Sequence, residues 1–272
     1  MANKIRSKPV AFSIISVFAI TISWGFISLL VRETLGQHGA QLLLLATSAV
    51  NIAIAVLAIF LLGAINQIHG FKHALRAKGF MKGCLALIPV AAFLILNLTL
   101  SASVMSYISA ENIGIFPLTA AMQATSALMQ NVLFRGLLVT ALFIKLSATK
   151  NERVKSVLAA SALYLVIYIP INILNTGSLE LMQLVNTFVM GIGFCAAYMY
   201  SKNLLCLVTT QGIWQILVSA IDVFGIDGYA QFTPLALAVL LAILTSIVVF
   251  AVILCRRAEP FCPAGTASHL AQ

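Results

Sequence analysis

Polar side chains recur at helical spacing within a long apolar segment that runs from residue 117 to residue 146. Four of them are separated by 4, 3 and 4 residues and so share one helix face: Thr119, Gln123, Ser126 and Gln130. Just beyond, Asn131 and Arg135 are four apart and within reach of each other. Two interpretations are open for this face, a polar binding site or a structural clamp that ties helices together.

The elements that carry these residues must lie in a membrane. Charged residues make up 8% of the 272-residue chain and hydrophobic residues 61%, whereas a soluble domain carries about a quarter charged residues. The surplus apolar surface therefore has to face lipid. The net charge of +9 does not indicate a nucleic-acid partner, because the basic residues lie in short loops between apolar segments, as the positive-inside rule describes.

Hydropathy predicts an all-α, polytopic transmembrane bundle of about eight spanning helices. The predicted spans are 10–31, 40–63, 83–106, 117–146, 156–174, 183–201, 204–224 and 232–255. Fourteen of the 16 basic residues fall on one side of this arrangement, which predicts cytoplasmic N- and C-termini. Arg135 is the one charge deep inside a span. We interpret 1–258 as a single transmembrane domain and 259–272 as a short flexible tail.

Four polar residues on three predicted helices have similar depths. Measured along the helices from the basic ends, Gln130, Tyr168, Gln211 and Gln215 lie about 13–22 Å in. We therefore expect them to line one cavity.

Three short motifs in this region resemble the CPBP family, which comprises the CAAX prenyl protease type 2 and the Abi bacteriocin-processing membrane proteins. The family's first motif is Glu-Glu, three residues and Arg; here the segment 130–136 reads Q-N-V-L-F-R-G and contains Phe134 and Arg135. The second is an aromatic residue with His four positions later, matched by Tyr164 and Tyr168. The third is His, three residues and Asn or Asp. The resemblance covers roughly 115–220, which implies a CPBP-like core.

The departures from the family pattern fall on its chemistry. The two Glu positions hold Gln130 and Asn131, the two His positions hold Tyr168 and Gln211, and the Asn position holds Gln215. In the family, Glu and His are proposed to activate a water for peptide hydrolysis. An amide cannot act as that general base, and Tyr is neutral near pH 7. No carboxylate, His or Cys ligand remains for a metal, so we expect neither a metal nor another cofactor.

The favoured hypothesis is a degenerate pseudoprotease that acts by binding. The resemblance implies a bacterial inner-membrane protein that contacts a peptide or membrane partner, such as a bacteriocin precursor or export machinery, in maturation, export or self-immunity. An active CAAX-type endopeptidase with non-standard residues and a small-molecule transporter remain as alternatives. We further expect Arg135, without its usual counter-ion, to rely on amide oxygens such as that of Asn131 and on backbone carbonyls or water.

Overall fold

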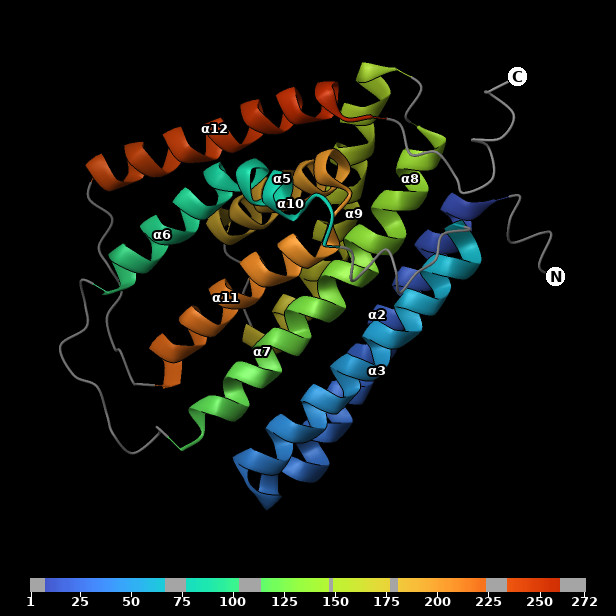
Figure 1. The fold of residues 1–272 in the computed structure, drawn as a ribbon. Coiled ribbons are helices and arrows are strands. Elements are labelled where there is room, and N and C mark those ends of the chain that lie inside the picture. The colour runs from blue at the N-terminus through green and yellow to red at the C-terminus, as the bar shows by residue number, and fades with distance from the viewer. Residues whose placement is uncertain are drawn as a thin grey trace.

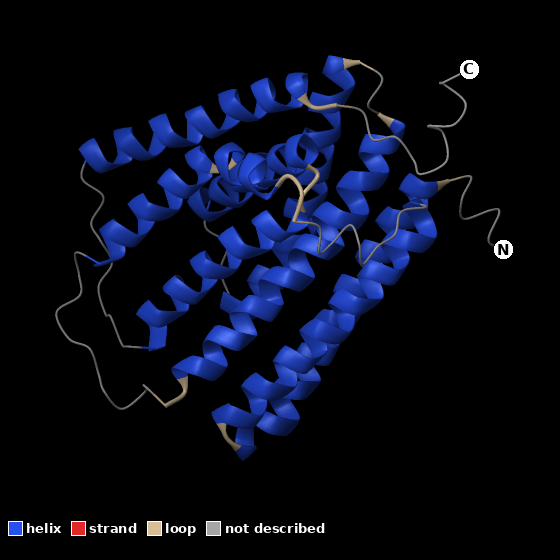
Figure 2. Ribbon diagram, in the orientation of Figure 1, coloured by secondary structure: helices blue, strands red, loops and turns tan. Residues whose placement is uncertain are grey.

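A computed structural model describes residues 8–66, 77–102, 114–146, 149–176, 181–223 and 234–259. Every regular element in these ranges is a helix (Figures 1 and 2). Apart from Glu259, the predicted tail lies outside them. The elements are α2 (Pro9–Leu35), η1 (Gly36–His38), α3 (Ala40–Asn66), α5 (Phe80–Ala86), α6 (Ile88–Ala102), α7 (Phe116–Gln130), η3 (Asn131–Val139), α8 (Thr140–Lys145), α9 (Lys150–Thr176), α10 (Leu181–Ser201), α11 (Leu204–Val223) and α12 (Pro234–Arg257).

The predicted membrane bundle is confirmed. Six of the described helical segments are long and apolar enough to cross a bilayer, and a shorter apolar segment covers Leu204–Ala220. The predicted span 83–106 differs, because it is divided into α5 and α6 around Leu87. Pro89, in the first turn of α6, explains the break, since proline lacks an N–H and its ring clashes with the carbonyl four residues earlier.

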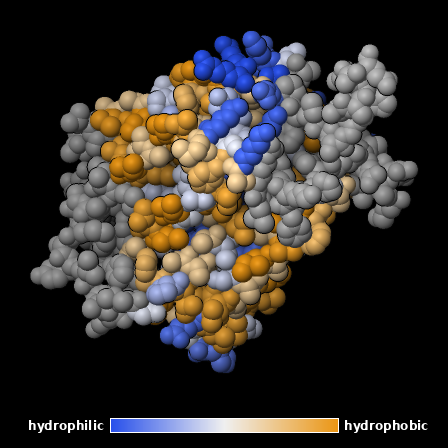
Figure 3. Space-filling view, in the orientation of Figure 1, coloured by the Kyte–Doolittle hydropathy of each residue, from blue (hydrophilic) through white to orange (hydrophobic). Residues whose placement is uncertain are grey.

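The outer surface of this multi-pass membrane protein is apolar. Large hydrophobic side chains such as Phe26, Phe60, Ile95 and Leu181 are each more than half exposed. In Figure 3, hydrophobic residues fill the middle of the visible face, and hydrophilic residues gather at two opposite edges. This banding is what contact with a lipid bilayer requires.

Loops that the charge pattern assigns to one side of the membrane meet in the structure. Asn203, after α10, donates from Nδ2 to the Lys78 carbonyl before α5, at 3.2 Å. Arg153, near the start of α9, donates to the carbonyl of Ala258, just after α12. These contacts place the joined ends side by side, as the positive-inside pattern predicts. Which side faces the cytoplasm stays a prediction.

One continuous helix, α7–η3–α8, forms the centre of the bundle. The segment 131–143 is buried at every position. In Figure 1 this green helix runs diagonally, with α2 and α3 on one side and α11 on the other. A span enclosed by protein can hold polar side chains that lipid would not accommodate.

Helix α10 approaches α6 and α12 closely at Gly193. A Cβ built on Gly193 would lie 2.7 Å from Val90 Cγ2 and 2.9 Å from Ile247 Cγ2. Both neighbours are β-branched and therefore stiff at χ1, so they cannot turn aside. Small residues at such crossings allow membrane helices to approach each other.

We therefore predict that Gly193→Ala lowers stability by about 1–3 kcal/mol. Thermal unfolding of the purified protein in detergent would measure it. Gly25→Ala is the matched control, because a Cβ on Gly25, inside α2, meets nothing within 4 Å. Equal melting temperatures for the two variants would contradict the close packing of α10.

Candidate functional site

The first motif lies in a wide turn of the central helix. The segment η3, Asn131–Val139, is π-helical. A π-helix closes its hydrogen bonds between residues i and i+5, and such turns occur frequently at functional sites. Residues five apart therefore lie about one turn apart, so Gln130 and Arg135 lie on nearly the same face of the helix. Gly136 in the same segment has Leu204 Cδ1 3.1 Å from where a Cβ would be, so the start of α11 lies close beside it.

A chain of amides joins this segment to α11. Gln211 on α11 accepts with one oxygen, Oε1, from Asn131 Nδ2 at 3.0 Å and from Arg135 NH1 at 3.3 Å. Its own Nε2 donates to Gln130 Oε1 at 2.6 Å. Gln130 Nε2 then donates to Ser126 Oγ at 3.2 Å. Gln211 is thus the residue through which the first and third motifs make contact.

Arg135 is 3% exposed, and no carboxylate among the described side chains pairs with it. Its guanidinium carbon lies 5.0 Å from the centre of the Tyr164 ring and 5.2 Å from that of Phe194. Cation–π attraction to two rings and an amide oxygen therefore take the place of an ion pair. The oxygen belongs to Gln211; the predicted acceptor, Asn131 Oδ1, is buried and has no hydrogen-bond partner.

These groups border a cavity of about 510 Å³, a size common for ligand pockets. All four residues predicted from their depth contribute to it: Gln130, Tyr168, Gln211 and Gln215. Arg135 and Tyr164 line it as well. Asn131 is buried and does not line the cavity. Its Nδ2 also donates a hydrogen bond to the Ala127 carbonyl at 2.8 Å. That this cavity is a functional site stays a prediction.

The N-terminal end of α10 supplies cavity-lining residues that the sequence analysis did not predict. Gln183, Asn186 and Thr187 line the cavity together with Trp214 of α11. Gln183 Nε2 donates to the hydroxyl of Tyr168 at 3.4 Å. Spacings of three and four from Gln183 place this set on one helix face, so the same periodicity argument would have found it.

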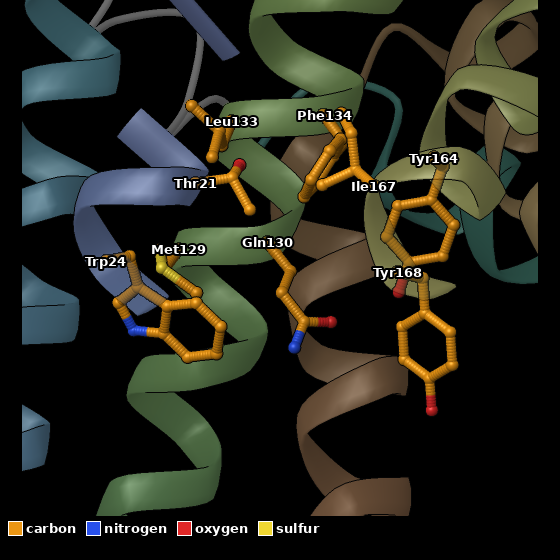
Figure 4. Close-up of a pocket in the computed structure, with 9 residues that line it drawn as sticks. All are labelled: Thr21, Trp24, Met129, Gln130, Leu133, Phe134, Tyr164, Ile167 and Tyr168. Atoms are coloured by element: carbon orange, nitrogen blue, oxygen red, sulfur yellow. The ribbon is translucent and has the colours of Figure 1, made fainter. Parts of the chain in front are cut away.

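A smaller pocket of about 60 Å³ adjoins the cavity and shares Gln130, Tyr164 and Tyr168 with it. Figure 4 shows the Gln130 side chain between Trp24 of α2 and Tyr168 of α9. Phe134 lines this pocket, and its ring meets the Tyr164 ring edge-on with centroids 4.8 Å apart. Apart from Asn131, the family-equivalent residues thus border one or both of two neighbouring spaces.

The cavity's polar lining consists of amides, hydroxyls and one guanidinium. None of these groups accepts a proton readily near neutral pH. Among the described residues, no three His, Cys, Asp or Glu side chains gather as a metal site. The arrangement can offer and accept hydrogen bonds and present one positive charge.

Comparison with known proteins supports the family resemblance. Residues 112–217 match the family model for type II CAAX prenyl endopeptidase, Rce1-like. The match confirms the predicted resemblance to the CAAX protease family over 106 of the 272 residues, a range that contains the three motif segments. No curated protein and no solved structure matches the chain.

The shared oxygen of Gln211 gives a test of the network. We predict that Gln211→Leu destabilises the protein by about 3 kcal/mol, because it leaves the Arg135 guanidinium and the Asn131 amide without their buried acceptor. Gln211→Glu should retain the parent's stability, since a carboxylate can accept from both groups and the Gln130 amide can turn to donate. Thermal unfolding in detergent compares the two, and an equal loss in both would show that the network does not depend on this oxygen.

Proposed function

We propose that this membrane protein, whose residues 112–217 match the Rce1-like CAAX endopeptidases, binds a peptide or a membrane partner in the polar cavity and does not hydrolyse it. The family's catalytic positions supply its binding surface. On this proposal, the chain is a pseudoprotease that kept the pocket and lost the chemistry.

The amide network is the observation that carries the proposal. Hydrolysis needs a base to deprotonate water, and the position of the family's first Glu holds Gln130, whose Oε1 already accepts a 2.6 Å bond from Gln211. Gln211, at a family His position, is held in turn by Arg135 and Asn131. These hydrogen bonds hold the side chains in fixed positions, and a preorganised surface of this kind favours binding.

The resemblance also motivates a cellular setting. We propose a bacterial cytoplasmic membrane location with both termini in the cytoplasm, supported by the one-sided basic loops. The partner would be a bacteriocin precursor or a component of its export machinery, met during maturation, export or self-immunity. Such a partner would contact the protein within the membrane or at its short loops.

The proposal predicts binding without cleavage. Purified protein in liposomes, mixed with prenylated CAAX peptides and leader-bearing bacteriocin precursors, should retain peptide but release no fragment by mass spectrometry. An active family member serves as the positive control for cleavage. Fragments that appear with the parent, and disappear with both Gln130→Ala and Gln211→Ala, would overturn the proposal in favour of a working protease.

A pair of variants on α10 locates the binding. Thr187→Trp fills the cavity from its wall, so we expect it to reduce peptide retention at least about tenfold. Val185→Trp changes an exposed, 40% accessible residue on the same helix, outside the cavity lining, and should retain peptide like the parent. Equal retention by both variants would place the binding elsewhere.

A further inference from the structure

Two cysteines on different helices lie side by side, outside the polar cavity. The thiol of Cys206 on α11 donates to Cys84 Sγ on α5, and the two sulfur atoms are 3.8 Å apart. Both cysteines are free thiols. Lys82 precedes Cys84 by two residues, which is about 3 Å of helix rise. The pair therefore lies close to the basic end of α5.

The backbone around this pair is held in place by close contacts. Gly79, with φ of 90°, precedes α5, and a Cβ on it would lie 2.6 Å from the Ser201 carbonyl oxygen at the end of α10. Asn203 Oδ1 accepts from the Cys206 N–H at 2.7 Å, while its Nδ2 donates to the Lys78 carbonyl at 3.2 Å. One side chain thus ties the first turn of α11 to the segment that leads into α5.

The separation of the two sulfur atoms is small enough for a disulfide. Next to Cys84, a Cβ on Gly83 would lie 3.0 Å from Cys206 Cβ, so α11 approaches α5 at a point where α5 has no side chain. The sulfur atoms of a disulfide are about 2.05 Å apart, so these two must close by about 1.7 Å. Rotation about χ1 between staggered positions moves a cysteine sulfur further than this.

The two thiols differ in how an oxidant can reach them. Cys84 is half-buried, whereas Cys206 is fully buried behind it. Cysteines that sense oxidants are accessible and lie next to a second cysteine that resolves the oxidised form. Cys195 and Cys255 are both buried, so Cys84 is the accessible thiol among the residues that the structure describes.

We propose that Cys84 and Cys206 form a reversible disulfide when the protein meets a peroxide, and that this bond locks α5 to α11. The peroxide transfers one oxygen atom to the Cys84 thiol, which becomes a sulfenic acid, and water is released. The Cys206 sulfur then attacks the Cys84 sulfur, and the hydroxyl leaves with the Cys206 proton as a second water. Two thiols are oxidised to one disulfide and the peroxide is reduced to two waters. A dithiol reductant restores both thiols by exchange.

Thiol counting tests the proposed bond in the full-length protein. Every protein carries Cys262→Ser, which removes the cysteine outside the described residues. Reduced protein in nanodiscs is treated with hydrogen peroxide and denatured, its free thiols are counted by maleimide labelling, and unreduced peptides are mapped by mass spectrometry. We expect the parent to lose two thiols and yield peptides linked through residues 84 and 206, and dithiothreitol should restore both thiols.

Two cysteine variants assign the reacting thiols. Cys84→Ser removes the accessible thiol and should yield no disulfide after the same treatment. Cys255→Ala is the matched control, because it removes a buried cysteine on α12, and it should lose two thiols like the parent. A disulfide that forms equally in Cys84→Ser would assign the oxidation to other cysteines and overturn the proposal, as would a parent whose thiol count stays constant under peroxide.

Thermal unfolding tests the lock separately. A covalent link between residues 84 and 206 closes a long loop in the unfolded chain, so oxidation should raise the melting temperature of the parent by at least about 5 °C. Cys84→Ser should melt at the same temperature with and without peroxide. A linked pair with an unchanged melting temperature would overturn the lock and leave the disulfide site standing. These outcomes are independent of the proposed peptide binding, because neither cysteine lines the cavity.

Discussion

The structure depends on the burial of one guanidinium inside a membrane protein. Arg135 is enclosed by the bundle, and nothing in the described residues provides the carboxylate that such a charge ordinarily requires. An amide oxygen on α11 and two aromatic rings on α9 and α10 stabilise it, together with side-chain hydrogen bonds to Tyr164 and Cys195. These three helices must therefore hold fixed positions around η3, and the close packing at Gly193 helps to hold α10 against α6 and α12.

Replacement of acids by amides changes what such a wall can do. A carboxylate only accepts hydrogen bonds, whereas an amide both donates and accepts, so Gln211 can join Gln130 to Arg135 in one chain of bonds. Two carboxylates beside Arg135 would give this region a net negative charge, and the amides leave it positive. The same change removes a general base and creates an attraction for anions. The lack of a general base at these positions and the positive charge of the wall thus have a common cause.

The sequence predicted the broad architecture because hydropathy and the alternation of basic loops report directly on the bilayer. Helix rise converts residue number into depth, so the sequence placed four residues at similar depth, and the structure shows that they line one cavity: Gln130, Tyr168, Gln211 and Gln215. The predicted amide acceptor for Arg135 is present, but it belongs to Gln211 on another helix and not to the neighbouring Asn131. Spacing along one helix gives no information about which side chain an adjacent helix presents. The π-helical turn and the break before Pro89 also depend on local backbone geometry that hydropathy does not record.

The wide turn at η3 limits how the chain can change in length. Removing one of the residues 136–139 would favour an ordinary α-helix, in which residues five apart lie on different faces. Gln130 and Arg135 would then no longer point the same way. A single-residue deletion in a surface loop is absorbed locally. In this segment it would separate Gln130 from Arg135, so homologous chains that keep this cavity should show no length variation between residues 131 and 139.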